Sequence, residues 1–388
     1  MASGIIHVIL SQGYQTFFGK YKMQPWVENI NKILEERGFN IYVFTAGEVS
    51  QTYIKDGVKV SISKRLSMLS DPFSLDLTLR LFLVRKPSFA IIHGLQHILT
   101  LFSLIVYSIR NVPVVILVHG LYVHSKITKL LCLRDLIIRN ILLTTRTPYI
   151  LIALTNYDKS LLLNEWKIPK DKVKISKVPL YLTKEELKLI EQIKKRYFEY
   201  IMAESTKVRF LYIGRIVYEQ KRIDRLIKIF YQFLKKGGAN AELIIAGEGP
   251  LKQPLLGLIK KLRINEFVKI KGAISEKEKW LLYLTSTALV LTSDFEGLPR
   301  TIFEAFSSGK IVIVPNICGL NEIVHNGING FIFNNDEHLL MLLNLVAANK
   351  QLMLRMGYNN YELANKQFIL ETNKEDILSC LRILKIEC

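Results

Sequence analysis

Residues 287–310 read TALVLTSDFEGLPRTIFEAFSSGK and contain the change of secondary structure that decides the fold. The apolar run ALVLT is typical of a buried strand, and RTIFEAFSS has the spacing of an amphipathic helix. Pro299 suits the first turn of this helix, because the N–H that proline lacks would be unpaired there anyway. Gly309 supplies the stop. The stretch therefore predicts a strand, a loop and a helix, which is half of a parallel βαβ unit.

The same alternation of apolar runs and amphipathic stretches continues along the whole chain. In the first half we expect strands at residues 5–10, 40–45, 89–93, 114–119 and 149–154. In the second half we expect strands at residues 208–214, 241–247, 267–272, 287–293 and 310–315. This order predicts an α/β fold with two Rossmann-like, doubly wound parallel sheets, each with a ligand crevice at the carboxyl ends of its strands.

A polar segment, residues 179–207, separates the two sets of strands and is rich in lysine and glutamate. With 388 residues the chain is long enough for two separate cores. We therefore expect a domain at 1–182, a linker at 183–206, a second domain at 207–370, and a final helix at 371–388 that can return to the N-terminal domain.

The composition is that of a folded globular protein, with 49% hydrophobic and 22% charged residues. The four cysteines form no CxxC pair and no cluster with histidine, so neither a disulfide framework nor a zinc site is expected. The N-terminal apolar run is too short for a signal peptide, and the apolar stretch 97–118 is broken by Arg110, Asn111 and Pro113. We expect a cytoplasmic protein, either soluble or peripheral on the cytoplasmic face of a membrane.

Positive charge is concentrated in the first half. The net charge is +19, and residues 51–150 hold 13 Lys and Arg against 4 Asp and Glu, a net of +9. This favours an anionic partner, namely a membrane surface, nucleic acid or a phosphorylated substrate; the alternative is a solvated lysine-rich surface. Residues 126–147 fit a basic amphipathic helix lying on an anionic bilayer, or a helix packed on its own sheet with its basic face in solvent.

Two glutamates flank the start of the helix predicted after Pro299. The free N–H groups and positive dipole of a helix start form a phosphate site, and Gly297 allows a ligand close to the backbone. Glu296 precedes this start, and Glu304 lies about 7–8 Å beyond Pro299 along the helix axis. Carboxylates bind hydroxyls, so the pair predicts a ligand with a phosphate centre and hydroxyl-rich ends, as in a nucleotide-sugar; the alternative is two solvated surface acids.

A second group of candidate residues, expected to point into the same crevice, lies in RFLYIGRIVYEQKRIDRLIKIF, residues 209–230. A strand here leads into a turn with Gly214, Arg215 and Lys221, and an amphipathic helix follows. Two cations beside a helix start would neutralise a diphosphate, and arginine can bind it in bidentate fashion. Alternatively, both are ordinary surface residues.

Five segments of the second half resemble, in order and spacing, the retaining nucleotide-sugar glycosyltransferases of family 4, in glycosyl transferases group 1. They are GRIVYEQK (214–221), AGEGP (246–250), FVKIKGAIS (267–275), SDFEGLPRTIFEAFSSGK (293–310) and GLNEIVHNGINGFIF (319–333). The resemblance implies the GT-B fold, with an acceptor-binding domain and a nucleotide-sugar-binding domain facing a central cleft. Departures from the pattern are Arg222 where a glycine is usual, Ile311 in place of a proline, and Asn321 in place of a proline.

The resemblance also implies roles for individual residues. Glu296 would bind the donor sugar and Glu304 the ribose, while Arg215 and Lys221 would hold the diphosphate and stabilise it as it leaves. The backbone at Gly297 to Pro299 would cap the phosphate. The donor-binding residues implied are Gly19, Gly214, Arg215, Lys221, Gly272, Glu296, Gly297, Leu298, Pro299 and Glu304, and the catalytic ones are His119, Arg215, Lys221 and Glu296.

The first half follows the family pattern more faintly. His119 ends the strand PVVILVH and resembles the histidine that contacts the donor sugar, whereas His93, at a neighbouring strand end, fits a structural role. In the loop after the first strand the usual glycine pair is replaced by Gly13 and Gly19, of which we expect Gly19 to approach the donor phosphate, or Lys20 or Lys22 to substitute for it.

No Asp-x-Asp motif occurs, so we expect a metal-independent enzyme without cofactors whose partners are a nucleotide-sugar donor and a glycan or lipid-linked acceptor. A nucleotide-sugar epimerase of the same fold is the first alternative, although no acid/base residues beyond the two glutamates stand out. The second is a basic protein that binds nucleic acid or a membrane surface; the basic region lacks the interleaved aromatics of a nucleic-acid site. The donor base and sugar, the acceptor and its linkage, and the oligomeric state stay open.

Overall fold

The computed structural model describes residues 4–10, 16–17, 20–21, 25–55, 57–65, 74–121, 129–204, 207–238, 241–317 and 319–384. Its contacts divide the chain into a first unit, residues 1–179 with 374–388, and a second unit, residues 180–373. The segment expected as a linker contains α6 (Lys184–Arg196) and α7 (Phe198–Glu204), and both helices belong to the second unit. Thr183 and Glu186 close a capping box at the start of α6, which makes it a stable helix.

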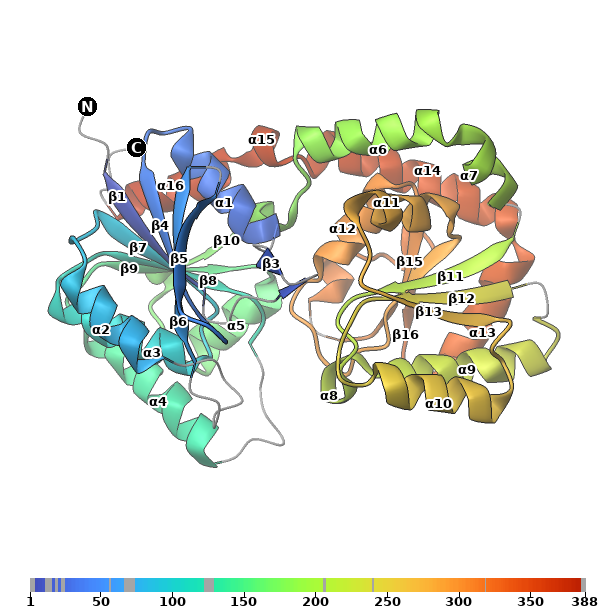
Figure 1. Cartoon of the computed structure of the whole chain (residues 1–388), viewed down its shortest axis with the longest axis horizontal. Coiled ribbons are helices and arrows are strands. Elements are labelled where there is room, and N and C mark those ends of the chain that lie inside the picture. Colours follow the sequence, from blue (N-terminus) through green and yellow to red (C-terminus); the bar gives the residue numbers. More distant parts are fainter. Residues whose placement is uncertain are drawn as a thin grey trace. The chain divides into compact units, whose positions relative to one another are not determined.

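The first unit contains an eight-stranded sheet in the order β10-β9-β8-β7-β1-β4-β6-β5, parallel except for β5 against β6 (Figure 1). Its strands are β1 (Ile5–Leu10), β4 (Asn40–Gly47), β5 (Gln51–Lys55), β6 (Val58–Lys64), β7 (Phe89–His93), β8 (Val114–Val118), β9 (Tyr149–Ala153) and β10 (Val173–Ile175). A separate two-stranded ribbon is formed by β2 (Thr16–Phe17) and β3 (Lys20–Tyr21).

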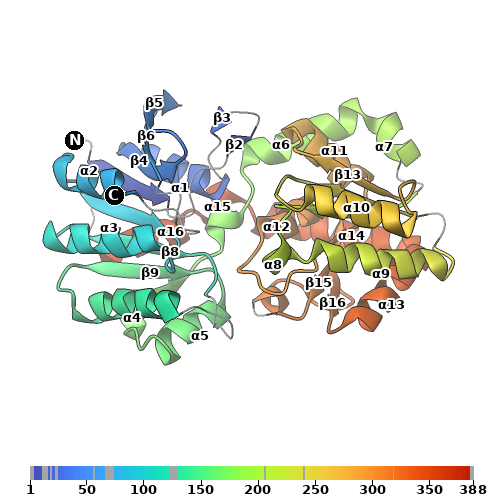
Figure 2. The ribbon, with the colours of Figure 1, turned by 60° about the horizontal axis from the view of Figure 1, so that its bottom comes forward.

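Helices cover both faces of this sheet (Figure 2). Side chains of α2, α3, α4 and α5 share one hydrophobic core with the strands. The connection from β1 to β4 runs the opposite way across the sheet, so its right-handed crossover puts α1 on the other face. The helices are α1 (Pro25–Glu35), α2 (Leu75–Leu83), α3 (Ile98–Ile109), α4 (Lys129–Thr144), α5 (Asn156–Asn164) and α16 (Glu375–Ile383), with 3-10 turns η1 (Lys170–Lys172) and, at the unit boundary, η2 (Val178–Leu180).

His7 in β1 is a buried titratable group, with 0% of its surface exposed, and its Nδ1 lies 3.1 Å from the Tyr107 hydroxyl. Burial, and secondarily the charge of Arg110, lowers the pKa of His7 from 6.5 to about 3. Below about pH 6.5 the unfolded chain therefore binds a proton that folded His7 does not. We expect this to lower the free energy of unfolding by about 1.4 kcal/mol per pH unit, down to about pH 3.

Urea unfolding curves measured between about pH 4 and pH 7 check this prediction. In the variant His7→Gln the free energy of unfolding should depend less steeply on pH than in the wild type, because the buried imidazole with the lowered pKa is absent. The exposed His325 offers the matched control, and His325→Gln should leave the slope unchanged. Equal slopes in the wild type and His7→Gln would contradict the assignment.

The second unit contains a fully parallel sheet in the order β13-β12-β11-β14-β15-β16. Its strands are β11 (Val208–Ile213), β12 (Ala241–Ala246), β13 (Val268–Gly272), β14 (Ala288–Val290), β15 (Ile311–Pro315) and β16 (Gly330–Phe333). Besides α6 and α7, its helices are α8 (Tyr218–Lys221), α9 (Ile223–Lys235), α10 (Lys252–Leu262), α11 (Glu276–Thr285), α12 (Arg300–Ser307), α13 (Asp336–Ala348), α14 (Lys350–Gln367) and α15 (Leu370–Asn373), with the 3-10 turn η3 (Leu320–Glu322).

Candidate active site

Three loops pack backbone against backbone at the carboxyl edge of the second sheet. The Gly214 N–H donates to the Ala246 carbonyl at 3.0 Å, and the Gly247 N–H donates to the Gly272 carbonyl at 2.8 Å. A Cβ added to Gly247, whose φ is +145°, would lie 1.8 Å from the Gly214 carbonyl oxygen. Glycine is therefore required at 247 so that the loops after β11, β12 and β13 can form one continuous shelf.

Lys221 and Glu296 meet at this edge, where the loops after β11 and β14 come together. The Lys221 ammonium pairs with Oε1 of Glu296, and the two side chains are 14% and 7% exposed. The Ser293 hydroxyl donates to the same carboxylate oxygen at 2.6 Å, and the Gln220 amide lies 3.4 Å from Oε2. Lys221, predicted to bind the phosphate, and Glu296, predicted to bind the sugar, are thus in direct contact. Ser293 and Gln220, which hold the Glu296 carboxylate, were not predicted from the sequence.

The same two loops are fastened together by hydrogen bonds. The Thr292 hydroxyl donates to the carbonyls of Lys221 and Arg222, both at 3.1 Å, and the Asp294 N–H donates to the Gln220 carbonyl at 2.9 Å. Arg222 has left-handed backbone, with φ 48° and ψ 44°, which explains why a glycine is usual at this position. Its guanidinium bonds Asp294 at 2.9 Å, which helps to offset the roughly 1–2 kcal/mol that this conformation costs.

Arg215 is exposed and belongs to the same cluster. Its guanidinium donates to the Gln220 side-chain oxygen at 3.2 Å, so Gln220 links Arg215 to Glu296. Below it, the buried Tyr212 hydroxyl donates to the Arg215 carbonyl at 2.9 Å and fixes the turn. Burial, and then the Glu296 charge, raises the pKa of Tyr212, which keeps this hydroxyl a donor.

The helix start predicted as a phosphate site lies next to this cluster in the chain. Pro299 is the N-cap of α12, with extended backbone, whereas a first-turn position was predicted; the helix itself begins at Arg300. Leu298, 5% exposed, anchors the loop in the core. Among the described residues no side chain caps this helix start, so its first N–H groups suit an anion.

Glu304 lies in a separate, buried cluster. Its carboxylate accepts from Lys279 at 3.2 Å, from the Tyr283 hydroxyl at 2.9 Å and from Arg300 at 3.1 Å. Burial raises the pKa of Glu304, but the charges of Lys279 and Arg300 outweigh it and hold the pKa below its ordinary value. The two glutamates therefore belong to different clusters, and a ribose at Glu304 would compete with three protein donors.

This cluster reaches α6 through Arg300. The Arg300 guanidinium donates to the Glu186 carboxylate at 2.6 Å and lies 3.4 Å from the Tyr181 carbonyl. Of these contacts, only the spacing of Arg300 and Glu304, four residues apart on one helix, could be read from the sequence. The sequence around Lys279 and Glu186 does not indicate that these residues contact Glu304 and Arg300.

Unit 1 carries the remaining predicted residues. His119 follows β8 and stacks on His93, with ring centroids 5.6 Å apart and His93 Nδ1 3.3 Å from His119 Nε2. Burial, and then the charge of His97, lowers the pKa of His119 to about 3, so its imidazole is neutral at neutral pH. Gly13, Gly19 and Lys22 lie outside the described residues.

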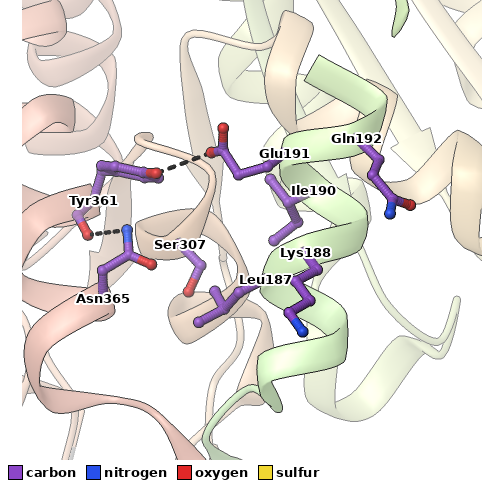
Figure 3. Close-up of a pocket in the computed structure, with 8 residues that line it drawn as sticks. All are labelled: Leu187, Lys188, Ile190, Glu191, Gln192, Ser307, Tyr361 and Asn365. Carbon is purple, nitrogen blue, oxygen red and sulfur yellow. Dashed lines mark hydrogen bonds between the residues drawn. The ribbon is translucent and has the colours of Figure 1, made fainter. Parts of the chain in front are cut away.

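A pocket of about 390 Å³ lies at the other end of α12 (Figure 3). Ser307, the last residue of α12, borders it, about 12 Å along the helix from the Pro299 end. The Tyr361 hydroxyl of α14 donates to Glu191 of α6 at 2.9 Å, which fastens α6 to this unit. The lining residues are Leu187, Lys188, Ile190, Glu191, Gln192, Ser307, Tyr361 and Asn365. The pocket is therefore separate from the Lys221 and Glu296 cluster.

Comparisons with known structures define the fold. Sucrose-phosphate synthase from Thermosynechococcus elongatus superposes with a TM-score of 0.76 at 14% identity, covering 98% of this chain and 99% of that one. Anabaena HepE, in complex with UDP and glucose, superposes with a TM-score of 0.71 at 16% identity, covering 97% and 99%. The chain has the GT-B fold.

Sequence comparisons then identify the second half. Residues 194–363 match the family model of Glycosyl transferases group 1. An uncharacterized glycosyltransferase of Methanocaldococcus jannaschii is 36% identical over 166 residues, 42% of this chain and 39% of that protein. The alpha-monoglucosyldiacylglycerol synthase of Acholeplasma laidlawii is 27% identical over 159 residues, which are 41% of this chain and 39% of that protein. The match spans well under half the length of these relatives, and residues 194–363 are a group 1 glycosyltransferase domain.

Proposed function

We propose that this protein is a retaining, metal-independent glycosyltransferase of the family 4 type, which moves a sugar from a nucleotide-sugar to a glycan or lipid-linked acceptor. The observation that carries the proposal is the pairing of Lys221 with Glu296 beside an uncapped helix start. A cation and a carboxylate in contact there can bind the phosphate and the hydroxyls of one donor. HepE, which has the same fold, was solved with UDP and glucose bound.

Donor binding would exchange partners within this pair. A diphosphate over the start of α12 attracts the Lys221 ammonium and the exposed Arg215 guanidinium. Glu296 keeps its Ser293 hydrogen bond and accepts from sugar hydroxyls in place of Lys221. The glycine shelf of Gly214, Gly247 and Gly272 brings the backbone close to the ligand, as base recognition through main-chain groups requires.

In the transfer step, the bond between the anomeric carbon and the phosphate oxygen breaks, and a bond to the acceptor oxygen forms on the same face of the sugar. The acceptor proton goes to the leaving phosphate oxygen, so charges and atoms balance. Lys221, Arg215 and the helix start stabilise the negative charge of the leaving group, worth about 3 kcal/mol of barrier for each well-placed donor. Neutral His119 serves as a hydrogen-bonding partner of the sugar.

The acceptor belongs to the first unit in this proposal, and the name of the Acholeplasma laidlawii relative includes a diacylglycerol. Together with the basic charge of residues 51–150, this favours a lipid-linked or membrane-proximal acceptor and a peripheral location on the membrane.

A thermal-shift screen against UDP-, GDP- and ADP-sugars in EDTA tests the donor assignment. We expect one base to raise the Tm, because a ligand at about 100 times its Kd adds about 2.7 kcal/mol to the free energy of unfolding. Slow release of free sugar and nucleoside diphosphate should follow in the same buffer. An isomerised nucleotide-sugar would point to the epimerase, activity that EDTA abolishes would contradict metal independence, and no stabilisation by any donor would overturn the proposal.

A further inference from the structure

Three neighbouring helices of the first unit expose an unusual amount of apolar surface. Helix α3 contacts both α2 and α4, and Figure 1 shows the three as a layer on one side of the sheet. Large apolar side chains point into solvent from all three: Leu75, Leu79, Phe82, Leu83, Ile105, Ile109, Leu133, Leu136, Ile137 and Leu143. Leu83 and Ile109 are 85% and 68% exposed.

Helical geometry places these side chains on the outer side of the layer. Successive residues of a helix are turned by about 100°, so in α2 the exposed Leu79 and Leu83 lie opposite the buried Leu77 and Leu81. In α3 and α4 the exposed residues likewise lie opposite the buried ones, which contact the sheet core. Each helix is thus apolar on two faces, and only one of them is used by the core.

Basic residues form a rim at one end of this layer. The three helices run between parallel strands, so their carboxyl ends lie at the same edge of the sheet. Arg85, Lys86 and Arg146, all exposed, and Arg110 follow these ends. They adjoin the most exposed apolar residues, Leu83 and Ile109, because both sets lie at the helix ends.

The acidic residues of this region are already neutralised. Residues 75–146 hold nine Lys and Arg and two Asp, a net of +7. Asp76 pairs with Arg80 at 2.8 Å, and Asp135 pairs with Arg134 at 2.7 Å. The face therefore presents apolar side chains with uncompensated positive charge, which would repel a second copy of the same face.

We propose that the outer face of α2, α3 and α4 docks on an anionic lipid bilayer. Phe82, Leu83, Ile109 and Leu143 enter the boundary between headgroups and acyl chains, and Arg85, Lys86 and Arg146 contact the anionic headgroups. Among the described residues no helix is both long and apolar enough to cross a membrane, and the docking is peripheral. Of the two alternatives expected for residues 126–147, the proposal keeps the contact of this helix with an anionic bilayer. It differs in the contacting face of α4, because Arg134 is buried and the leucines Leu133, Leu136 and Leu143 are exposed.

Vesicle flotation tests the proposal with the full-length protein. We expect it to float with vesicles of equimolar phosphatidylcholine and phosphatidylglycerol, more weakly with phosphatidylcholine alone, and less at high salt. The triple variant Phe82→Ser, Leu83→Ser, Ile109→Ser should lose more than about tenfold in affinity. Replacing Arg85, Lys86 and Arg146 by serine should cost on the order of a hundredfold.

The matched control removes exposed apolar side chains from the second unit, with Leu352→Ser, Leu354→Ser and Tyr358→Ser on α14. This variant should float like the wild type, and circular dichroism should show that all variants are folded. Wild type that floats with neither vesicle, or an apolar triple variant that floats normally, would overturn the proposal. A dimer that sedimentation detects in the wild type but not in the apolar triple variant would also overturn the proposal, because the face would then bind a second copy of this chain.

Discussion

Replacing Lys221 or Glu296 by alanine is expected to reduce transfer by about 10²–10³-fold each, with the fold intact. Lys221→Ala removes a cation that stabilises the leaving diphosphate, and Glu296→Ala removes the acceptor for the sugar hydroxyls. Steady-state kinetics with the donor found in the screen should place most of the loss in kcat for Lys221→Ala, because its interaction strengthens as the phosphate charge develops. Normal turnover in either variant would count against the site.

Two exposed residues of the same unit provide matched controls. Lys260→Ala and Glu266→Ala remove the same charges far from the carboxyl edge of the sheet, and both should leave turnover unchanged. The double variant Lys221→Ala, Glu296→Ala should lose less than the sum of the two single losses, because the side chains are in direct contact. Additive losses would mean that the two residues act independently.

Most of the parallel strands could be predicted from the sequence because they are short apolar runs, and β1, β7, β8, β9 and β15 are buried at every residue. The parallel strands β6, β10 and β16 were not predicted. The expected strand at 89–93 agrees with β7, and the expected strand at 5–10 agrees with β1. The β5–β6 hairpin was missed although the sequence carries a signal: it contains the turn dipeptide Asp56-Gly57, after which the apolar Val58, Val60 and Ile62 alternate with polar residues. The two strands were not recognised because Lys and Ser residues interrupt their apolar pattern.

The site could be predicted only where its residues follow strands. Lys221 and Glu296 were placed in one crevice because the carboxyl ends of β11 and β14 share an edge of the sheet. The contacts of the Glu304 cluster could not be predicted, because Arg300 and Glu186 are 114 residues apart and meet only through the packing of α12 and α6. Nothing in the local pattern around Lys279 indicates that it is buried against Glu304.

Glu304→Ala is expected to lower the free energy of unfolding of the second unit by about 3–5 kcal/mol, because it leaves Lys279 and Arg300 buried without their shared carboxylate. For a unit of this size that is a fall in Tm of about 6–20 °C. Glu304→Gln should cost less, since the amide oxygen still accepts from Tyr283. Urea unfolding and calorimetry check this, with the exposed Glu337→Ala as control. A Glu304→Ala protein of normal stability that has lost only nucleotide affinity would show instead that this carboxylate binds the donor and does not hold the two cations.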